Sequence, residues 1–192
     1  MGKIVISQNV TLDGVVQDPT GDDGFQHGGW FNQALELDFP AWAEAEMEEA
    51  LNAEALLLGR RSDAYFGPRW IGRDGPFADR LNSLPKYVVS STVSEAQWGN
   101  ATILSGDAVE EAAKLRQQID GEIIVYASRQ LVHALMDNGL VDEIRVIVFP
   151  FVLGVGDRLF GDMSDKASLR RLSVQPLGAG LVYTRYEVVR TA

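Results

Sequence analysis

Arginine and hydroxyl side chains follow three apolar runs of this chain directly. The run "LLLG" leads into Arg60, Arg61 and Ser62, "YVVS" leads into "ST", and "IVYA" leads into "SRQ". Arg69 and Arg73 add two further positive charges shortly after the first run. Guanidinium and hydroxyl groups donate hydrogen bonds to phosphate oxygens, and Arg is well suited to them. The pattern favours a cradle for a dinucleotide with an extra phosphate, although solvated surface arginines and ordinary helix caps remain the alternative.

Strands must position these residues, and the apolar runs predict where the strands lie. We expect strands over 3–9, 55–58, 86–91, 101–106, 122–127 and within 141–154, followed by a hairpin whose arms, 169–177 and 180–189, flank "GAG" at 178–180. A glycine turn between two such arms is typical of a hairpin. In open α/β sheets, ligands bind outside the carboxyl ends of the strands, which is where the polar residues stand.

Helical patterns alternate with these strands. Phe39, Ala43, Met47 and Leu51 recur every four residues and predict a helix that begins near Phe39. A short helix is expected over 62–66, and two more over 107–119 and 128–139. Long loops are expected over 13–29 and 67–76. Asp107 and Ser128 are the expected N-caps of the last two helices. The whole chain, 1–192, therefore predicts a single α/β domain: a mostly parallel sheet with an antiparallel C-terminal hairpin.

Composition excludes several classes of function. A formal net charge of −10 disfavours nucleic acid and anionic membranes as partners. Cysteine is absent, and the two histidines support neither a metal site nor a Ser-His-Asp arrangement, so we expect no bound metal. No signal-peptide core or membrane span is visible, which predicts a cytoplasmic protein.

An ordered set of motifs resembles the dihydrofolate reductase-like fold, a three-layer α/β/α sandwich. The set comprises "TLDG" (11–14), "LLLGRRSDAYF", "KYVVSST" and "IIVYASRQLVHALMDNGLVDEIRVIVFPFVLGVGDRLF", and it runs over nearly the whole chain. Within that fold, the chain is most similar to the C-terminal reductase domain of the bifunctional riboflavin-biosynthesis deaminase-reductase. The resemblance implies an NADPH-dependent reductase, often a homodimer.

The resemblance also implies roles for individual residues. The cofactor would contact Gly59, Arg60, Arg61, Ser90, Ser91, Thr92, Ala127, Ser128, Arg129, Gln130 and Leu131. Substrate would contact Asn9, Thr11 and Trp30. One departure from the family concerns the turn that approaches the pyrophosphate, because Ala127-Ser128 stands where glycine is usual.

The deaminase half of the bifunctional enzyme has no counterpart in these 192 residues, so we expect a stand-alone reductase. It would transfer hydride from NADPH to a C=N or C=O carbon of a small carbonyl or heterocyclic substrate that is pteridine- or pyrimidine-like. The alternatives are 5-amino-6-(5-phosphoribosylamino)uracil reductase activity, dihydrofolate reductase activity, or a non-catalytic dimeric nucleotide-binding module.

Two carboxylates compete as the proton source, with water as a further possibility. Asp13 follows the first strand and matches an acidic position of the riboflavin-type reductases, whereas Asp38 precedes the helix expected at Phe39. Asp38 lies roughly where the folate reductases keep their acid on the first helix. Each carboxylate has a structural alternative: Asp13 would stabilise the turn into Gly14, and Asp38 would cap its helix and remain ionised. A carboxyl group beside a desolvated nicotinamide would have a raised pKa, and this argument favours Asp13.

Overall fold

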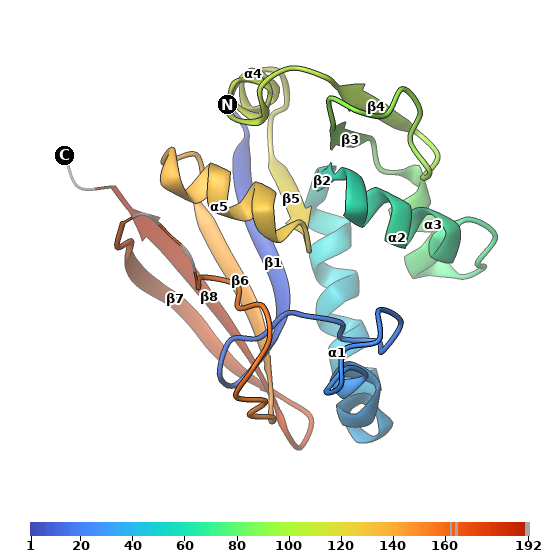
Figure 1. The fold of residues 1–192 in the computed structure, drawn as a ribbon, viewed down its shortest axis with the longest axis vertical. Coiled ribbons are helices and arrows are strands. Elements are labelled where there is room, and N and C mark those ends of the chain that lie inside the picture. The colour runs from blue at the N-terminus through green and yellow to red at the C-terminus, as the bar shows by residue number, and fades with distance from the viewer. Residues whose placement is uncertain (162, 164, 191–192) are drawn as a thin grey trace. The chain divides into compact units, whose positions relative to one another are not determined.

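The computed structural model describes residues 1–161, 163 and 165–190, which form thirteen helices and strands. Figure 1 shows their arrangement. In chain order they are β1 (Lys3–Thr11), α1 (Trp30–Asn52), β2 (Ala53–Gly59), α2 (Arg60–Trp70), α3 (Pro76–Ser83), β3 (Lys86–Val89), β4 (Ala101–Leu104), α4 (Ala108–Gln118), β5 (Glu122–Tyr126), α5 (Arg129–Asp137), β6 (Glu143–Phe149), β7 (Ser168–Leu177) and β8 (Leu181–Val189). None of the helices in this described part is long and apolar enough to cross a membrane.

The strands form one eight-stranded sheet in the order β4-β3-β2-β5-β1-β6-β8-β7. Strand β2 pairs in parallel with both β3 and β5, and β3 pairs in parallel with β4. Strands β7 and β8 are antiparallel and are joined by a turn in which Gly178 has a φ of +61°. The predicted fold class is confirmed: an α/β protein whose mostly parallel sheet ends in an antiparallel C-terminal hairpin.

Contacts divide the chain into two compact units, and each has its own apolar core. Unit 1 comprises Met1–Ile6 and Met47–Glu143, and unit 2 comprises Ser7–Glu46 and Ile144–Ala192. The core of unit 1 is built from aliphatic residues of its strands, including Leu56, Val88 and Ile124. The core of unit 2 centres on Trp30, whose ring packs edge-on against Phe149 at 5.2 Å between centroids.

Helix α1 begins nine residues earlier than the apolar repeat predicted, at Trp30 instead of Phe39. Pro40 lies inside α1, where a proline is unfavourable because it lacks the N–H for a helical hydrogen bond and disfavours helix in the residue before it. An interior proline costs about 3 kcal/mol. Burial of Trp30 and Leu35, which are 1% and 8% exposed, offsets much of that cost at roughly 1.5–3 kcal/mol for each large apolar side chain.

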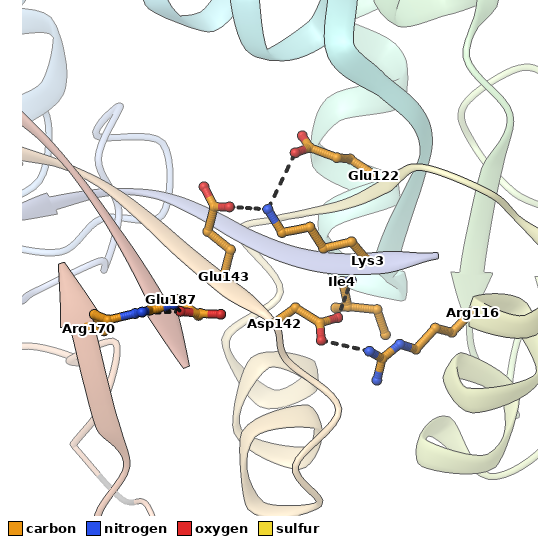
Figure 2. A network of polar contacts seen from close by, with 8 residues as sticks. All are labelled: Lys3, Ile4, Arg116, Glu122, Asp142, Glu143, Arg170 and Glu187. Carbon is orange, nitrogen blue, oxygen red and sulfur yellow. Dashed lines mark hydrogen bonds and ion pairs between the residues drawn. The ribbon is translucent and has the colours of Figure 1, made fainter. Parts of the chain in front are cut away.

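Ion pairs join the amino ends of neighbouring strands in unit 1 (Figure 2). Lys3, at the start of β1, donates to Glu143 at the start of β6 and lies 3.7 Å from Glu122 at the start of β5. Beside them, Asp142 accepts hydrogen bonds from the Ile4 N–H at 2.9 Å and from Arg116 at 2.6 Å. These contacts order the amino ends of the strands. The turns that follow β2, β3 and β5 lie at the opposite, carboxyl ends.

A buried lysine anchors the start of β3. The Lys86 ammonium donates to the carbonyl oxygens of Asn82 and Leu84, at the end of α3, and lies 4.7 Å from the centre of the Trp98 ring. Burial lowers the pKa of Lys86 to about 8, because desolvation penalises the charged form. Carbonyl groups at a helix C-terminus and an aromatic face both stabilise the remaining positive charge.

Candidate functional site

Three turns of unit 1 lie at the carboxyl ends of adjacent parallel strands. In the parallel pairing of β2 with β3, Leu58 stands opposite Val88 and Gly59 opposite Val89, so both strands end at the same level. Strand β5 pairs in parallel with the other side of β2. Figure 1 shows helices α2 and α5 leaving the sheet from β2 and β5. The carboxyl ends of β3, β2 and β5 therefore lie side by side.

The first turn presents Gly59, Arg60 and Arg61. Gly59 has a φ of −81° and a ψ of 159°, which any residue adopts, and a Cβ added there would lie 3.6 Å from the nearest side-chain atom. The fold itself therefore does not require glycine at this position. Arg60 and Arg61 begin α2, which is longer than the predicted 62–66, and both are exposed. Within the described residues neither arginine has a hydrogen-bond or ion-pair partner.

The other two arginines of the predicted positive cluster are held by aromatic rings. The Arg69 guanidinium lies 3.7 Å above the Tyr65 ring and donates to the Tyr65 carbonyl oxygen at 2.9 Å. The Arg73 guanidinium lies 4.8 Å from the centre of the Trp70 ring. Arg60 and Arg61 are therefore the better candidates for binding an anion, because no such stacking holds them in place.

The second turn follows β3 and contains Ser90, Ser91 and Thr92. Ser90 is buried, and its Oγ accepts hydrogen bonds from the N–H groups of Thr92 at 3.2 Å and Val93 at 3.3 Å. This local pattern is typical of serine in turns. Ser91 and Thr92 are exposed, so their hydroxyl groups are accessible to a ligand, whereas Ser90 shapes the turn.

The third turn joins β5 to α5 and contains two residues with left-handed backbone. Ala127 has a φ of 48° and Ser128 a φ of 55°. Ser128 is the N-cap residue by position, as predicted, but its side chain makes no cap hydrogen bond. Instead, the Ser128 Oγ accepts from the Gly59 N–H at 2.9 Å and bonds the Ser62 Oγ at 2.8 Å. The sequence placed Ser62 among the hydroxyl groups that follow the first apolar run, but it did not predict the bond between Ser62 and Ser128.

Arg129, Gln130 and Leu131 form the first turn of α5. The Leu131 side chain is buried in the apolar interior, so only its backbone can meet a ligand. N–H groups in the first turn of a helix have no partner within that helix, and they favour anions. Helices α2 and α5 both begin at this edge, so their first turns offer such groups in one place.

The remaining predicted residues lie in unit 2, and there Asp13 ties two loops together. Its carboxylate accepts hydrogen bonds from the Thr11 hydroxyl at 2.6 Å, the Gly154 N–H at 2.9 Å and the Leu153 N–H at 3.2 Å. The Thr11 hydrogen bond, together with these N–H groups, lowers the pKa of Asp13 to about 2, against the opposing effect of burial. The expectation of a raised pKa is wrong, because the donors stabilise the charged form.

Asp38 lies within α1 and accepts hydrogen bonds from the turn between β7 and β8. Its oxygens receive the N–H groups of Ala179 at 2.6 Å and Gly180 at 2.8 Å, and the residue is 4% exposed. The alternative role of Asp38 as a helix cap is wrong, because α1 begins eight residues before it, at Trp30. Asp38 instead fixes the tight turn of the C-terminal hairpin.

The three predicted substrate contacts all have partners within unit 2. Asn9 accepts from the Trp42 indole N–H at 3.2 Å, and Thr11, which is 1% exposed, also accepts from the Val15 N–H at 2.9 Å. Trp30 is a core residue whose indole N–H donates to the Gln17 carbonyl oxygen at 3.1 Å. In this arrangement Thr11 and Trp30 stabilise the fold, and Asn9 is the more accessible of the three.

Replacement of Asp13 by asparagine tests its role as an ionised tie between loops. An amide cannot accept all three hydrogen bonds as a carboxylate does, so we expect Asp13→Asn to lower the free energy of unfolding at pH 7 by roughly 1.5–3 kcal/mol. A lowered pKa contributes stability above the unfolded-state pKa near 3.8 and loses it as the pH falls toward 2. The difference between parent and variant should therefore shrink between pH 5 and pH 2 in urea unfolding.

The control for this measurement is Asp74→Asn, which alters an exposed loop carboxylate and should change stability little. A stability gap between parent and Asp13→Asn that is absent at pH 7, or that stays constant down to pH 2, would contradict the role of Asp13 as a tie.

Comparison with known proteins places the chain in a family. Residues 2–183 match the RibD C-terminal domain. The protein named YyaP of Bacillus subtilis is 25% identical over 189 residues, which cover 96% of this chain and 94% of that protein.

Solved structures share the fold. A putative riboflavin biosynthesis protein from Shewanella sp. PV-4 superposes with a TM-score of 0.73 at 22% identity, covering 98% of this chain and 99% of that one. A bifunctional diaminohydroxyphosphoribosylaminopyrimidine deaminase/5-amino-6-(5-phosphoribosylamino)uracil reductase from Thermotoga maritima gives a TM-score of 0.62 at 14% identity. That match covers 98% of this chain but 57% of the Thermotoga protein. With the family match extending over nearly all of its length, the chain belongs to the RibD C-terminal domain family.

Proposed function

We propose that the chain is an NADPH-dependent reductase that transfers hydride to a C=N or C=O carbon of a small, pteridine- or pyrimidine-like substrate. One observation carries the proposal: the three turns that follow β2, β3 and β5 lie together at the carboxyl ends of these adjacent strands. Membership of the RibD C-terminal domain family and the reductase named in the Thermotoga relative support the same reaction class.

The groups present at this edge fit a dinucleotide with an extra phosphate. Arg60 and Arg61 supply positive charge without a protein partner in the described residues, and Ser91 and Thr92 supply exposed hydroxyl donors. The fold does not require a glycine at position 59, and the missing Cβ there leaves the backbone accessible to a ligand. The first turns of α2 and α5 offer N–H groups to a pyrophosphate.

The dinucleotide supplies the hydride when bound, while the protein binds and orients it. Arg60 or Arg61 pairs with the phosphate that distinguishes NADPH from NADH. Asp13 is a poor proton donor near neutral pH, because its pKa is lowered to about 2. Asp38 has both oxygens engaged by backbone N–H groups, so we assign the proton to water.

Cofactor preference tests the proposal. We expect the parent to bind NADPH on the order of 10–100-fold more tightly than NADH, because a charge-assisted contact contributes roughly 1.5–3 kcal/mol. Arg60→Ala or Arg61→Ala should remove most of that preference in calorimetric titrations. Arg73→Ala, which removes an arginine stacked on Trp70, is the matched control and should retain the preference. Equal affinity of the parent for the two cofactors would contradict this assignment.

A turnover panel separates the reductase from its alternatives. NADPH oxidation should be followed with dihydropteridines, 5-amino-6-(5-phosphoribosylamino)uracil and simple carbonyl compounds. Turnover of the uracil compound or of dihydrofolate would identify one of the two narrower activities. Tight NADPH binding without any turnover across the panel would instead favour a non-catalytic nucleotide-binding module.

We further propose a homodimer formed through the C-terminal hairpin. Strand β7 is the last strand of the sheet, and most of its residues are exposed, among them Leu169, Leu172 and Val174 at 42%, 47% and 51%. An exposed edge strand with apolar side chains is a site for pairing with another chain. Sedimentation should give a dimer for the parent and a monomer for Leu172→Lys/Val174→Lys, with Leu37→Lys on α1 as an exposed control. A monomeric parent at micromolar concentration would refute this proposal.

A further inference from the structure

The turn between β5 and α5 adopts a backbone conformation that its residues disfavour. Ala127 and Ser128 both have positive φ, at 48° and 55°, and the ψ of Ser128 is 41°. In the left-handed region the Cβ of an L-residue comes too close to a neighbouring carbonyl oxygen, and only glycine avoids this cost. Two adjacent residues in this conformation persist only where the surrounding structure holds them.

Two serine hydroxyls hold this turn. The Ser62 Oγ accepts a hydrogen bond from the Ser128 N–H at 3.0 Å and from the Ser128 Oγ at 2.8 Å. The Ser128 Oγ in turn accepts from the Gly59 N–H at 2.9 Å. Ser62 is 6% exposed, so its loss would leave the Ser128 N–H without an acceptor in a site that little water reaches.

The same hydrogen bonds connect two strand ends of unit 1. Ser62 and Gly59 belong to the turn from β2 into α2, and Ser128 belongs to the turn from β5 into α5. Since the Ser128 carbonyl accepts from the Val132 N–H at 2.9 Å, the conformation of Ser128 sets the first turn of α5. The serine pair therefore fixes the direction in which the first turn of α5 points.

We propose that Ser62 is a positioning residue: through Ser128 it holds the Ala127-Ser128 turn in the left-handed conformation that aims α5 at the dinucleotide. The hydroxyl pair thus replaces the conformational freedom of glycine. The cofactor part of this inference rests on the proposed function, whereas the conformational part stands on the hydrogen bonds alone.

Glycine rescue tests the inference. We expect Ser62→Ala to weaken NADPH binding about tenfold, the effect of losing a buried hydrogen bond, and to lower the Tm by several degrees. Ser62→Ala/Ala127→Gly should recover NADPH affinity to within about threefold of the parent, because glycine adopts positive φ without the serine pair. Ser83→Ala, which removes an exposed hydroxyl bonded to the Arg80 carbonyl oxygen, is the control and should change neither quantity appreciably.

Two results would overturn the positioning role: a Ser62→Ala protein with lowered Tm but parental NADPH affinity, or a double variant in which affinity is not restored. If the parent itself does not bind NADPH, the proposed function fails, and amide hydrogen exchange decides the inference separately. Ser62→Ala should then accelerate exchange at Ser128 and Val132, and the added Ala127→Gly should slow it again at Val132, whose acceptor, the Ser128 carbonyl oxygen, remains present. Unchanged exchange at both amides would refute the inference.

Discussion

The parallel pairing of β2 with β3 on one side and β5 on the other is the constraint on which the candidate site depends. Neighbouring strands that run in the same direction have their carboxyl ends on the same side of the sheet. The turns that follow them therefore lie close together even when they are far apart in sequence. Gly59 and Ser128, which are 69 residues apart, are joined by a single hydrogen bond. Ion pairs among Lys3, Glu122 and Glu143 order the opposite, amino ends of β1, β5 and β6 (Figure 2).

Carboxylates determine local structure in unit 2 by accepting backbone N–H groups. Asp13 accepts from Gly154 and Asp38 from Ala179, and each pair is separated by 141 residues. Both aspartates stood out in the sequence as candidate acids, yet each is occupied by a distant turn. For Asp13, the hydrogen bonds from Thr11, Gly154 and Leu153 stabilise the charged form and lower the pKa of the carboxyl group.

Patterns local in sequence predicted much of the fold. The apolar runs located the strands, "GAG" located the hairpin turn, and Asp107 caps α4 through the N–H groups of Val109 and Glu110, as expected. The start of α1 was missed, because the cost of Pro40 is local whereas the burial of Trp30 is tertiary. The bond between Ser62 and Ser128 was missed for the same reason, because the two serines follow neighbouring strands but are 66 residues apart in sequence.

Amide hydrogen exchange with and without NADPH tests the central claim most directly, because it maps a ligand onto the backbone. The account predicts slower exchange on adding NADPH in three separate segments, 59–62, 90–92 and 127–131, each of which follows one of three adjacent parallel strands. The hairpin turn at 178–180, held by Asp38, serves as the internal reference and should not change. Protection in one of the three segments alone, or in none of them, would contradict the claim that these strand ends form one dinucleotide site.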